Sequence, residues 1–582
     1  MLENRRLQPP GGTGILAWAR HYRRAWLSGD LTAGLVVSVM IIPQSMAYAM
    51  LAGLPVQVGL YASLVPLLAY ALFGSSMSLS VGPVAVTGLM TATLIAPLAA
   101  VGSADYLQLA IWLALLSGLM LFVAGLLRLG FLANFLSHPV ISGFISGAAI
   151  LIILSQLPHL LGLAAMPGNP AELIRQWQPI NSLVLGFGLV SLLLLLYARS
   201  LLAAHLRALG LNASLALLLS RLAPIVVVVL AMAVTALAGL ADMGVPVVGS
   251  LPAGLPSVYW STPDLQSLRA LLLPAALISL VSFVESVSIA QSMARHKRQS
   301  IEPDQELLGL GAANLGSGLT GGFAVCGGFS RSAVNVEAGA NTPLAGVVAA
   351  LVIGVILMTV VPLFAHLPLV ILAVVILVAV TPLIDLASLK RAWHYDRAEG
   401  ATLLCTALGV LVLGIEGGIV LGICLSIAAQ LWRGSRPHIA VVGRVPGTHY
   451  FRNTQRHLVE TEPQMLALRI DENIFFANTK AIEQSIYRAL REYPDTREVL
   501  LILSAVNHID GTGLDMLSEL TEGLLERDVH LHLAEVKGPL MDQLEETDWL
   551  REQVREVFPS TDIAFTTLAN QKRPLATPAD ED

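Results

Sequence analysis

The sequence predicts a polytopic α-helical membrane protein with a small water-soluble α/β domain after its last membrane span. Composition points to the membrane class, because 55% of the 582 residues are hydrophobic, only 13% are charged, and the mean hydropathy is +0.71. Charge is divided unevenly along the chain. Of the 40 acidic and 34 basic residues, 25 and 15 lie from Arg436 onward, so the tail is net −10 and the preceding body is net +4.

This charge pattern indicates a mildly basic membrane body with an acidic tail, and it argues against a protein that binds nucleic acid. The cysteines Cys326, Cys405 and Cys424 lie in apolar surroundings without metal-ligand spacing, which favours buried thiols over a disulfide framework or a metal site. The arginine-rich N-terminus is not followed by a short apolar stretch with a small-residue cleavage site, so we do not expect a removable signal peptide.

Apolar segments of spanning length, or shorter pieces of it, are separated by Gly, Pro and charged loops, and they predict about fourteen membrane crossings. Seven lie in a first half, at residues 31–50, 56–73, 84–100, 108–127, 139–161, 182–198 and 222–240. Seven lie in a second half, at residues 271–293, 306–320, 330–340, 343–362, 367–384, 400–414 and 416–432. An odd number of crossings per half makes the second half an inverted repeat of the first.

Basic residues predict the orientation, because cytoplasmic loops collect Lys and Arg. With the N-terminal segment 1–30 in the cytoplasm, the loops after even-numbered spans are cytoplasmic too. Those loops carry Arg128, Arg199, Arg207, Arg295, Lys297, Arg298, Lys390 and Arg391. We therefore expect a multi-pass protein of the cytoplasmic (inner) membrane, with a transmembrane domain at 31–436 and a cytoplasmic tail.

The tail changes to a pattern of alternating strands and helices. Strands are predicted at residues 465–470, 499–503 and 529–534, and amphipathic helices at 479–491 and 512–525. This alternation indicates a small α/β domain, here residues 438–568. The polar residues 569–582 are expected to be disordered.

Two segments have the composition of helices that begin in the middle of the membrane. In the second half, a glycine-rich stretch from Gly321 to Phe329 leads into Ser330 and Arg331; in the first half, Gly82 and Pro83 precede an apolar helix. Helices that begin at matching places in inverted halves would direct their positive ends at a shared cavity, as in many secondary transporters. Simple Gly/Pro kinks that ease helix packing are the alternative.

Arg331 and Glu285 are the ionisable residues of this predicted site. An arginine at that depth costs at least ~2.5 kcal/mol, so Arg331 predicts a buried anion site, and its planar guanidinium suits an oxyanion. Glu285 lies in an otherwise apolar and hydroxyl-rich helix, where a carboxylate is a candidate for proton coupling. A fixed salt bridge between the two residues, or a hydrogen-bond anchor at Glu285, is the alternative.

Two pairs of polar residues complete the candidates. Gln44 and Tyr48 lie one helical turn apart after Pro43, so both can face one cavity; hydrogen bonds between helices are the alternative. In the tail, Thr512 can cap the helix that follows it, and Asp510 can favour the positive end of that helix. No metal, nucleophile-elbow or phosphate-loop motif is evident, so we expect neither an enzyme nor a cofactor.

Short motifs along nearly the whole chain together resemble those of one known family. They are Pro43-Gln-Ser-Met-Ala-Tyr-Ala49, Val58-Gly-Leu-Tyr-Ala-Ser-Leu-Val-Pro66, Gly74 with Val81-Gly-Pro-Val-Ala85, Gln305-Glu-Leu-Leu-Gly309, and Phe329-Ser-Arg-Ser-Ala-Val-Asn335 with Gly339-Ala-Asn-Thr-Pro343. The chain resembles the sulfate permease, or solute carrier 26, family. The resemblance implies fourteen membrane segments in two inverted repeats with a core and a gate domain, a cytoplasmic STAS domain, and a homodimer that moves anions by elevator-type alternating access.

Carried over by position, the resemblance implies an anion site at the two helix starts and the first span. The residues are Val84, Ala85, Ser330, Arg331, Gln44 and Tyr48. Glu285 occupies the place of an acidic residue linked with proton coupling in sulfate-transporting relatives, whereas bicarbonate-transporting relatives bind sodium in this region. Thr512, beside Asp510, matches a phosphorylated serine of anti-sigma-factor antagonists, although Gly511 stands where those proteins have a further serine.

Site and resemblance together predict a secondary active anion transporter, with proton-coupled sulfate uptake as the leading expectation. Sodium-coupled bicarbonate transport, or transport of a dicarboxylate, is the alternative, because the same donors would serve a carboxylate. An uncoupled anion channel, or a signalling scaffold whose output is the tail, is the alternative class.

Overall fold

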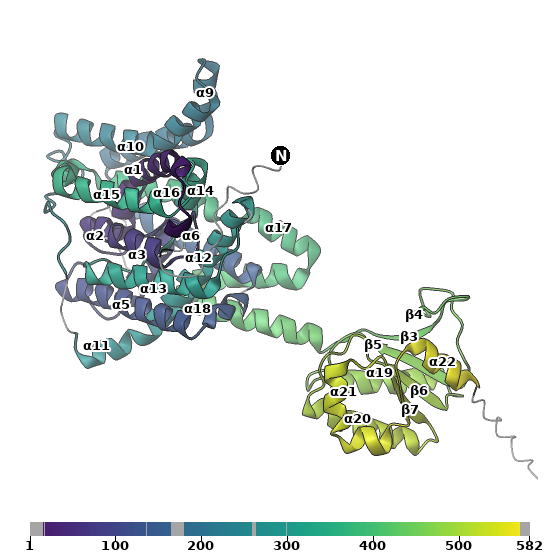
Figure 1. Cartoon of the computed structure of the whole chain (residues 1–582). Helices are drawn as coiled ribbons and strands as arrows, with labels where there is room; N and C mark the ends of the chain where they lie inside the picture. Colours follow the sequence, from purple (N-terminus) through teal and green to yellow (C-terminus); the bar gives the residue numbers. More distant parts are fainter. Residues whose placement is uncertain are drawn as a thin grey trace, which may run out of the picture. The chain divides into compact units, whose positions relative to one another are not determined.

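The chain divides into two compact units, Met1–Ser426 and Ile427–Asp582 (Figure 1). The computed structural model describes residues 16, 18–135, 137–163, 180–258, 263–297 and 299–570. Much of the predicted N-terminal segment and almost all of the predicted disordered tail lie outside the described residues. The predicted domain boundaries stay predictions.

The first unit is a bundle of helices. Its helices are α1 (Leu27–Leu51), α2 (Val56–Tyr61), α3 (Val65–Phe73), α4 (Ala85–Ile95), α5 (Ala104–Leu126), α6 (His138–Leu161), α8 (Ser182–Tyr197), α9 (Ala203–Ala208), α10 (Ala213–Leu237), α11 (Leu265–Ala270), α12 (Leu272–Lys297), α13 (Pro303–Leu319), α14 (Phe329–Glu337), α15 (Leu344–Thr359), α16 (Leu369–Val380), α17 (Leu386–Tyr395) and α18 (Arg397–Gly434). In the interior, α13 packs along α5 and α3, and α1 packs against α15 and α16.

The predicted helical membrane class is confirmed, since every predicted span falls on helices: the first twelve on one helix or a pair of short helices each, and the last two together on α18. Within the described residues, eight helical stretches are long and apolar enough to cross a membrane. Shorter apolar helices lie at Ala85–Ile95, Leu222–Leu237 and Leu344–Thr359. Inside α18, Gly414 has φ 81° and ψ 178°, a backbone conformation that glycine adopts without strain. This residue separates the two predicted spans 400–414 and 416–432.

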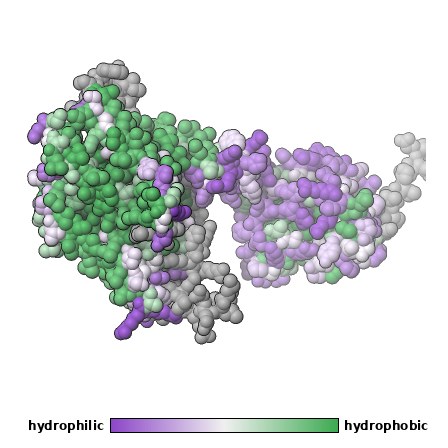
Figure 2. Space-filling view, turned by 90° about the horizontal axis from the view of Figure 1, so that it is seen from above, coloured by the Kyte–Doolittle hydropathy of each residue, from purple (hydrophilic) through white to green (hydrophobic). Residues whose placement is uncertain are grey.

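The outer surface of the first unit is apolar. Figure 2 shows hydrophobic residues covering most of the face it presents, whereas hydrophilic residues dominate the second unit. Among the exposed side chains are Leu193, Leu237 and Val412, which are 64%, 89% and 79% exposed. Water-soluble proteins rarely expose so large an apolar area. This surface therefore suits contact with lipid hydrocarbon.

The second unit contains a six-stranded sheet in the order β4-β3-β5-β6-β7-β8. The strands are β3 (Ile439–Arg444), β4 (Phe451–Asn453), β5 (Met465–Ile470), β6 (Glu498–Ile502), β7 (His530–Ala534) and β8 (Glu556–Phe558). Strands β5 to β8 are parallel, and β3 is antiparallel to both β4 and β5. The three predicted strands are β5, β6 and β7, so this part of the sequence prediction is confirmed.

Helices cover both faces of this sheet. On one face, Leu466 and Leu468 of β5 pack in a core with α19 (Thr479–Glu492), α20 (Gly511–Leu525) and α21 (Gly538–Glu545). On the other, Ala467 of the same strand packs with Phe565 of α22 (Thr561–Asn570). Successive side chains of a strand point to opposite faces. The continuous apolar pattern of β5 is thus explained by burial on both sides.

Glu498, at the start of β6, links the stability of this unit to pH. Its carboxylate contacts His532 Nε2 at 2.8 Å and Arg555 Nη1 at 3.9 Å. Burial alone would raise the pKa of Glu498, but the hydrogen bond and charge of His532, with the charge of Arg555, leave that pKa below its usual value. The ionised Glu498 carboxylate therefore contributes fully to the stability of this unit above the pKa of an unfolded glutamate, about 4.3. That contribution is lost as the pH falls through the lower pKa of the folded state.

We expect the amides of β6 and β7 to lose protection from hydrogen exchange on acidification below about pH 4.3, by ~1 kcal/mol or less because the ion pair is partly exposed. Exchange measured on the full-length protein, corrected for intrinsic rates, checks this. Glu498→Gln should flatten the pH dependence. An unchanged pH dependence in that variant contradicts the assignment.

Candidate functional site

Two very short strands from different halves of the chain pair inside the first unit. β1 (Val81–Gly82) and β2 (Cys326–Gly327) are antiparallel, with Val81 opposite Gly327 and Gly82 opposite Cys326. All four residues are buried. Irregular backbone at membrane depth is tolerated only where protein or a water-filled cavity surrounds it. Here each strand pairs with the backbone of the other.

A helix begins shortly after each strand. α4 begins at Ala85 after the N-cap residue Val84, and α14 begins at Phe329 after Gly328. Because the strands are antiparallel, the two helices leave them in opposite directions, each with its N-terminus toward the strand pair. Neither N-cap side chain bonds to its helix, so the first-turn N–H groups and the positive ends of both helices are available to a ligand.

The side chain of Arg331, in the first turn of α14, bridges the two helix starts. It is 2% exposed, and Nη1 donates a 2.8 Å hydrogen bond to the carbonyl oxygen of Pro83. Nη2 is buried and has no hydrogen-bond partner among the described residues, although buried polar atoms of proteins normally have one. One end of the guanidinium is thus anchored to the first half of the chain, and the other end is free to bind an anion.

Glycines on both sides make room for this guanidinium. A Cβ at Gly328 would lie 2.8 Å from both Nε and Nη2 of Arg331, and a Cβ at Gly82 would lie 3.3 Å from Nη1. The first distance is shorter than real Cβ contacts, so a side chain at Gly328 would displace the guanidinium. The close approach explains why the glycine-rich stretch ends directly before α14.

We expect Gly328→Ala to weaken anion binding roughly tenfold or more, because overpacking of this kind costs typically 1–3 kcal/mol. Binding or concentration-dependent uptake by the purified variant measures the effect. Gly186→Ala is the matched control, since Gly186 lies in α8 and a Cβ there would meet no atom within 4 Å. Equal affinity in both variants would contradict this role of Gly328.

A cavity with about 460 Å³ of empty space, part of it continuous with solvent, lies beside the guanidinium. It brings together all the residues that the sequence predicted for the membrane site: Gln44, Tyr48, Val84, Ala85, Glu285, Ser330 and Arg331. The sequence did not predict the remaining lining residues: Val86, Gly328, Phe329, Ala379, Val380 and Leu383. The last three belong to α16 and to the short helix η7 (Thr381–Leu383), which form a separate, apolar wall.

Gln44 and Tyr48 of α1 contribute neutral polar groups to this cavity. Tyr48 is 7% exposed and Gln44 is half-buried. Neither side chain is hydrogen-bonded to another residue in the described part of the chain. The alternative that they hold neighbouring helices together is therefore not observed, and both side chains can turn toward a ligand.

Glu285 of α12 lines the same cavity without pairing with Arg331. The hydrogen-bond partner of its Oε2 is the thiol of Cys326, with Sγ at 3.6 Å. No ion pair within 4.0 Å joins Glu285 to Arg331. A fixed salt bridge is thus not observed in this structure, whereas the contact with Cys326 fits the alternative of a hydrogen-bond anchor. Glu285 and Arg331 share a cavity, and each is hydrogen-bonded to another residue.

Polar contacts between the two halves of the chain hold the helix starts together. The backbone N–H of Ser80 donates to Ser332 Oγ at 2.9 Å, and Asn335 Nδ2 donates to the carbonyl oxygen of Ser78 at 3.0 Å. The backbone N–H of Gly328 donates to the carbonyl oxygen of Ser80 at 3.0 Å. These contacts join the segment before β1 to α14, and so they determine where Arg331 lies.

α13 supplies two supporting residues that sequence reasoning missed. Its fully buried Glu306 accepts hydrogen bonds from Tyr70 Oη at 2.9 Å and from Ser75 Oγ at 2.7 Å. Its Asn314 side chain binds both the N–H and the C=O of Val325, each at 2.9 Å. Both residues orient a segment that leads into a strand of the site. A carboxylate inside a predicted span was a usable signal for Glu306.

The predicted residues of the tail lie at the start of α20. Asp510 is the N-cap residue: its Oδ1 accepts from the N–H of Gly513 at 2.8 Å, and its Oδ2 from the N–H of Phe476 at 2.9 Å. Thr512 lies inside the first turn and is exposed. The expectation that Thr512 caps this helix was wrong. The cap is Asp510, the residue before the first helical position, because its side chain accepts a hydrogen bond from the N–H of the third helical residue, Gly513.

A buried guanidinium between two facing helix starts, inside a bundle with a lipid-compatible surface, defines a membrane transporter with a site for an anion. The family follows from comparison with known proteins. The Sulfate permease family model matches residues 27–406, and the STAS domain model matches residues 457–564. The chain belongs to the sulfate permease family. It is an anion transporter and not an enzyme.

Curated relatives match nearly the whole chain. A probable sulfate transporter of Mycobacterium tuberculosis is 35% identical over 535 residues, which cover 90% of this chain and 92% of the relative. The chloroplastic sulfate transporter 4.1 of Arabidopsis thaliana is 34% identical over 543 residues, or 89% of this chain and 76% of the relative. The high affinity sulfate transporter 2 of Stylosanthes hamata is 32% identical over 579 residues, with 96% and 85% covered.

Solved structures confirm the fold. The murine Solute Carrier 26 family member A9 anion transporter, in its inward-facing state, matches with a TM-score of 0.86 at 21% identity, over 96% of this chain and 94% of that chain. The transmembrane domain of the cyanobacterial bicarbonate transporter BicA matches with a TM-score of 0.58 at 23% identity, over 69% and 98%. The membrane fold followed by an α/β STAS domain is as the sequence predicted.

Proposed function

We propose that this protein takes up sulfate together with protons, as a secondary active transporter. The observation that carries the proposal is the unpartnered Nη2 of buried Arg331, which lies at a cavity between the positive ends of α4 and α14. An oxyanion suits both the planar guanidinium and the N–H groups of two helix starts. The names of relatives that are 32% to 35% identical to this chain favour sulfate.

Each lining residue has a role in this proposal. Arg331 supplies the positive charge. The backbone N–H groups of Ala85, after Val84 at the start of α4, and of Ser330, at the start of α14, supply directed hydrogen-bond donors. Gln44 and Tyr48 add neutral hydrogen bonds from α1. Because these donors suit a carboxylate as well, bicarbonate and dicarboxylates are the competing substrates in the experiment below.

Glu285 is the proposed proton-coupling group. It is the carboxylate of the cavity, its side chain lies near Arg331 without pairing with it, and its partner in the structure is the neutral thiol of Cys326. An anion that occupies Arg331 brings negative charge near Glu285, which favours the protonated carboxyl. Substrate and proton would then bind together.

Transport by this site requires that the cavity open to each side of the membrane in turn. The helix starts and the wall formed by α16 and η7 meet at the cavity, and sliding of one against the other is the proposed elevator-type motion. We further propose a homodimer in the cytoplasmic membrane, with the N-terminus and the STAS domain in the cytoplasm. Chemical crosslinking and protease accessibility of oriented vesicles would check both points.

Asp510 and Thr512 are the proposed regulatory positions of the STAS domain. Thr512 is exposed in the first turn of α20, where a phosphate group would meet the positive end of the helix. Phosphorylation there would add negative charge beside the Asp510 cap and compete with its two hydrogen bonds.

Uptake into proteoliposomes tests the proposed substrate and coupling ion. The purified protein is supplied with labelled sulfate, bicarbonate or succinate, and an inward proton or sodium gradient is imposed. We expect sulfate uptake that responds to the proton gradient and not to sodium. Sulfate flux without proton stimulation would refute the coupling, and sodium-stimulated bicarbonate or succinate uptake would favour the competing substrates. Flux at channel-like rates, unaffected by either gradient, would indicate an uncoupled pore.

A further inference from the structure

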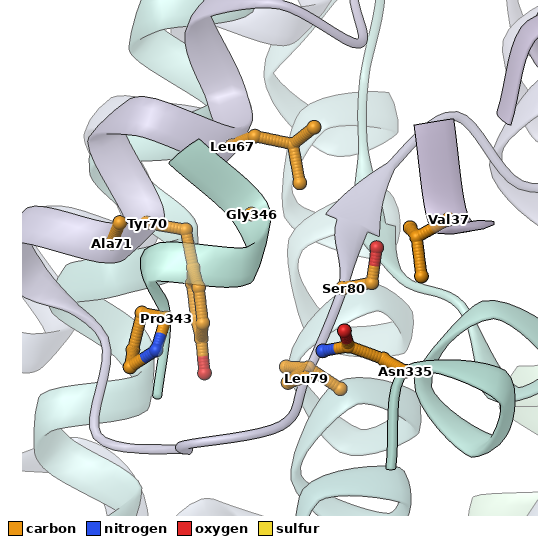
Figure 3. Close-up of a pocket in the computed structure, with 9 residues that line it drawn as sticks. All are labelled: Val37, Leu67, Tyr70, Ala71, Leu79, Ser80, Asn335, Pro343 and Gly346. Atoms are coloured by element: carbon orange, nitrogen blue, oxygen red, sulfur yellow. The ribbon is translucent and has the colours of Figure 1, made fainter. Parts of the chain in front are cut away.

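A second cavity lies beside the segment that precedes β1 (Figure 3). It has room for about one water molecule and is lined by residues of α1, α3, α14 and α15 and by the segment before β1. Most of the lining is apolar, as at Val37 and Leu67. Figure 3 shows two polar side chains, Ser80 and Asn335, directed into the space between these elements.

Each of these two side chains has a polar atom without a partner. Ser80 Oγ and Asn335 Oδ1 are buried and make no hydrogen bond to any described residue, and the two residues are 3% and 5% exposed. A buried polar atom normally has a hydrogen-bond partner, because its loss of hydration is otherwise uncompensated. Two such atoms at one cavity point to a bound molecule that joins them.

The remaining polar groups of both residues are already in use, which determines what the bound molecule must be. Asn335 Nδ2 donates to the carbonyl oxygen of Ser78 at 3.0 Å, so the free atom of this amide is the oxygen, which only accepts. The Ser80 hydroxyl can donate or accept. The ligand must therefore donate at least one hydrogen bond, and it needs no charge, since no lining side chain is charged.

We infer that a single water molecule binds here, donating to Asn335 Oδ1 and accepting from Ser80 Oγ. A buried water needs two to four polar partners and a space of about one water molecule, and this cavity offers both. A metal cation would need more oxygen ligands than these side chains supply.

The water joins the two halves of the chain at residues close in sequence to the anion site. Ser80 lies two residues before Gly82, and Asn335 lies one helical turn after Arg331. The bridge adds to the direct contact between Ser80 and Ser332. It therefore helps to hold together the segment before β1 and helix α14, which position the guanidinium. This inference rests on the packing of the transport unit and does not depend on which anion is carried.

Two serine substitutions test the inference by the sign of their effect. Ser80→Ala removes one partner of the water, so the thermal midpoint of the full-length protein should fall, by roughly 1–3 °C. Ser282→Ala is the matched control: Ser282 Oγ is also buried, has no partner among the residues that the structure describes, and does not line this cavity. Its removal should therefore leave the midpoint unchanged or raise it. An equal or higher midpoint for Ser80→Ala would overturn the proposal.

A density map of the full-length protein, at a resolution that shows ordered waters, gives an independent test that does not depend on variants. One peak within hydrogen-bond distance of both Ser80 Oγ and Asn335 Oδ1, present in sodium and in potassium buffers alike, is the expected result. Absence of a peak, or a peak that appears only with sodium, would overturn the assignment to water.

Discussion

Replacing Arg331 with alanine is expected to abolish anion binding and uptake. The guanidinium is the buried cation of the cavity, and among the described residues its one hydrogen-bond partner is the carbonyl oxygen of Pro83. Removing one partner of a buried charged contact costs roughly 3–5 kcal/mol, which lowers affinity at least about a hundredfold. Binding of labelled sulfate to the purified protein and uptake into proteoliposomes both measure this loss.

Two further variants show whether the effect belongs to this arginine. Arg199→Ala is the matched control, because Arg199 also donates to a backbone carbonyl, that of Val378, but is exposed and does not line the cavity. It should keep normal uptake. Arg331→Lys keeps the charge without the planar fork, so we expect intermediate affinity. Normal sulfate affinity in Arg331→Ala would remove the basis of the proposed site.

Replacing Glu285 with glutamine is expected to remove the response of uptake to a proton gradient. A gradient of one pH unit is worth about 1.4 kcal/mol per coupled proton, and so supports about tenfold accumulation for each proton carried. A glutamine cannot bind and release that proton, so accumulation driven by the pH gradient should disappear. Downhill exchange of sulfate should continue, because Arg331 and the helix starts are unchanged.

The control for this variant is Glu416→Gln. Glu416 is an exposed carboxylate of α18 and does not line the cavity, so its replacement should leave the pH profile of uptake as in the wild type. If Glu285→Gln retains proton-driven accumulation, the coupling group lies elsewhere. If it loses downhill exchange as well, Glu285 acts in anion binding and not only in coupling.

Much of the fold was predictable because the signals are local. Apolar runs bounded by glycine, proline and charge located the membrane helices, and the alternation of strand and helix patterns located β5, α19, β6, α20 and β7 within one residue at most boundaries. The broken helices were predictable from Gly82 and Pro83, and from the glycines before Ser330. In each case composition alone departs from that of an ordinary spanning helix.

Pairing across the fold was not predictable in the same way. The antiparallel contact of β1 with β2 involves only two residues of each strand. Two residues are too few to show the alternating pattern by which a strand is recognised in a sequence. The wall of the cavity formed by α16 consists of apolar residues such as Ala379 and Val380, which look like any spanning segment. The choice between a salt bridge and separate partners for Arg331 and Glu285 depends on distances that only the folded chain defines.

The central claim is that the starts of α4 and α14, with Arg331, form the anion site. A structure of the wild-type protein with bound selenate, a heavier analogue of sulfate, tests it most directly. The prediction is anion density within hydrogen-bond distance of Arg331 Nη2 and of backbone N–H groups at Ala85 or Ser330, displaced by excess sulfate. Saturating selenate bound elsewhere, with this cavity empty, would contradict the claim.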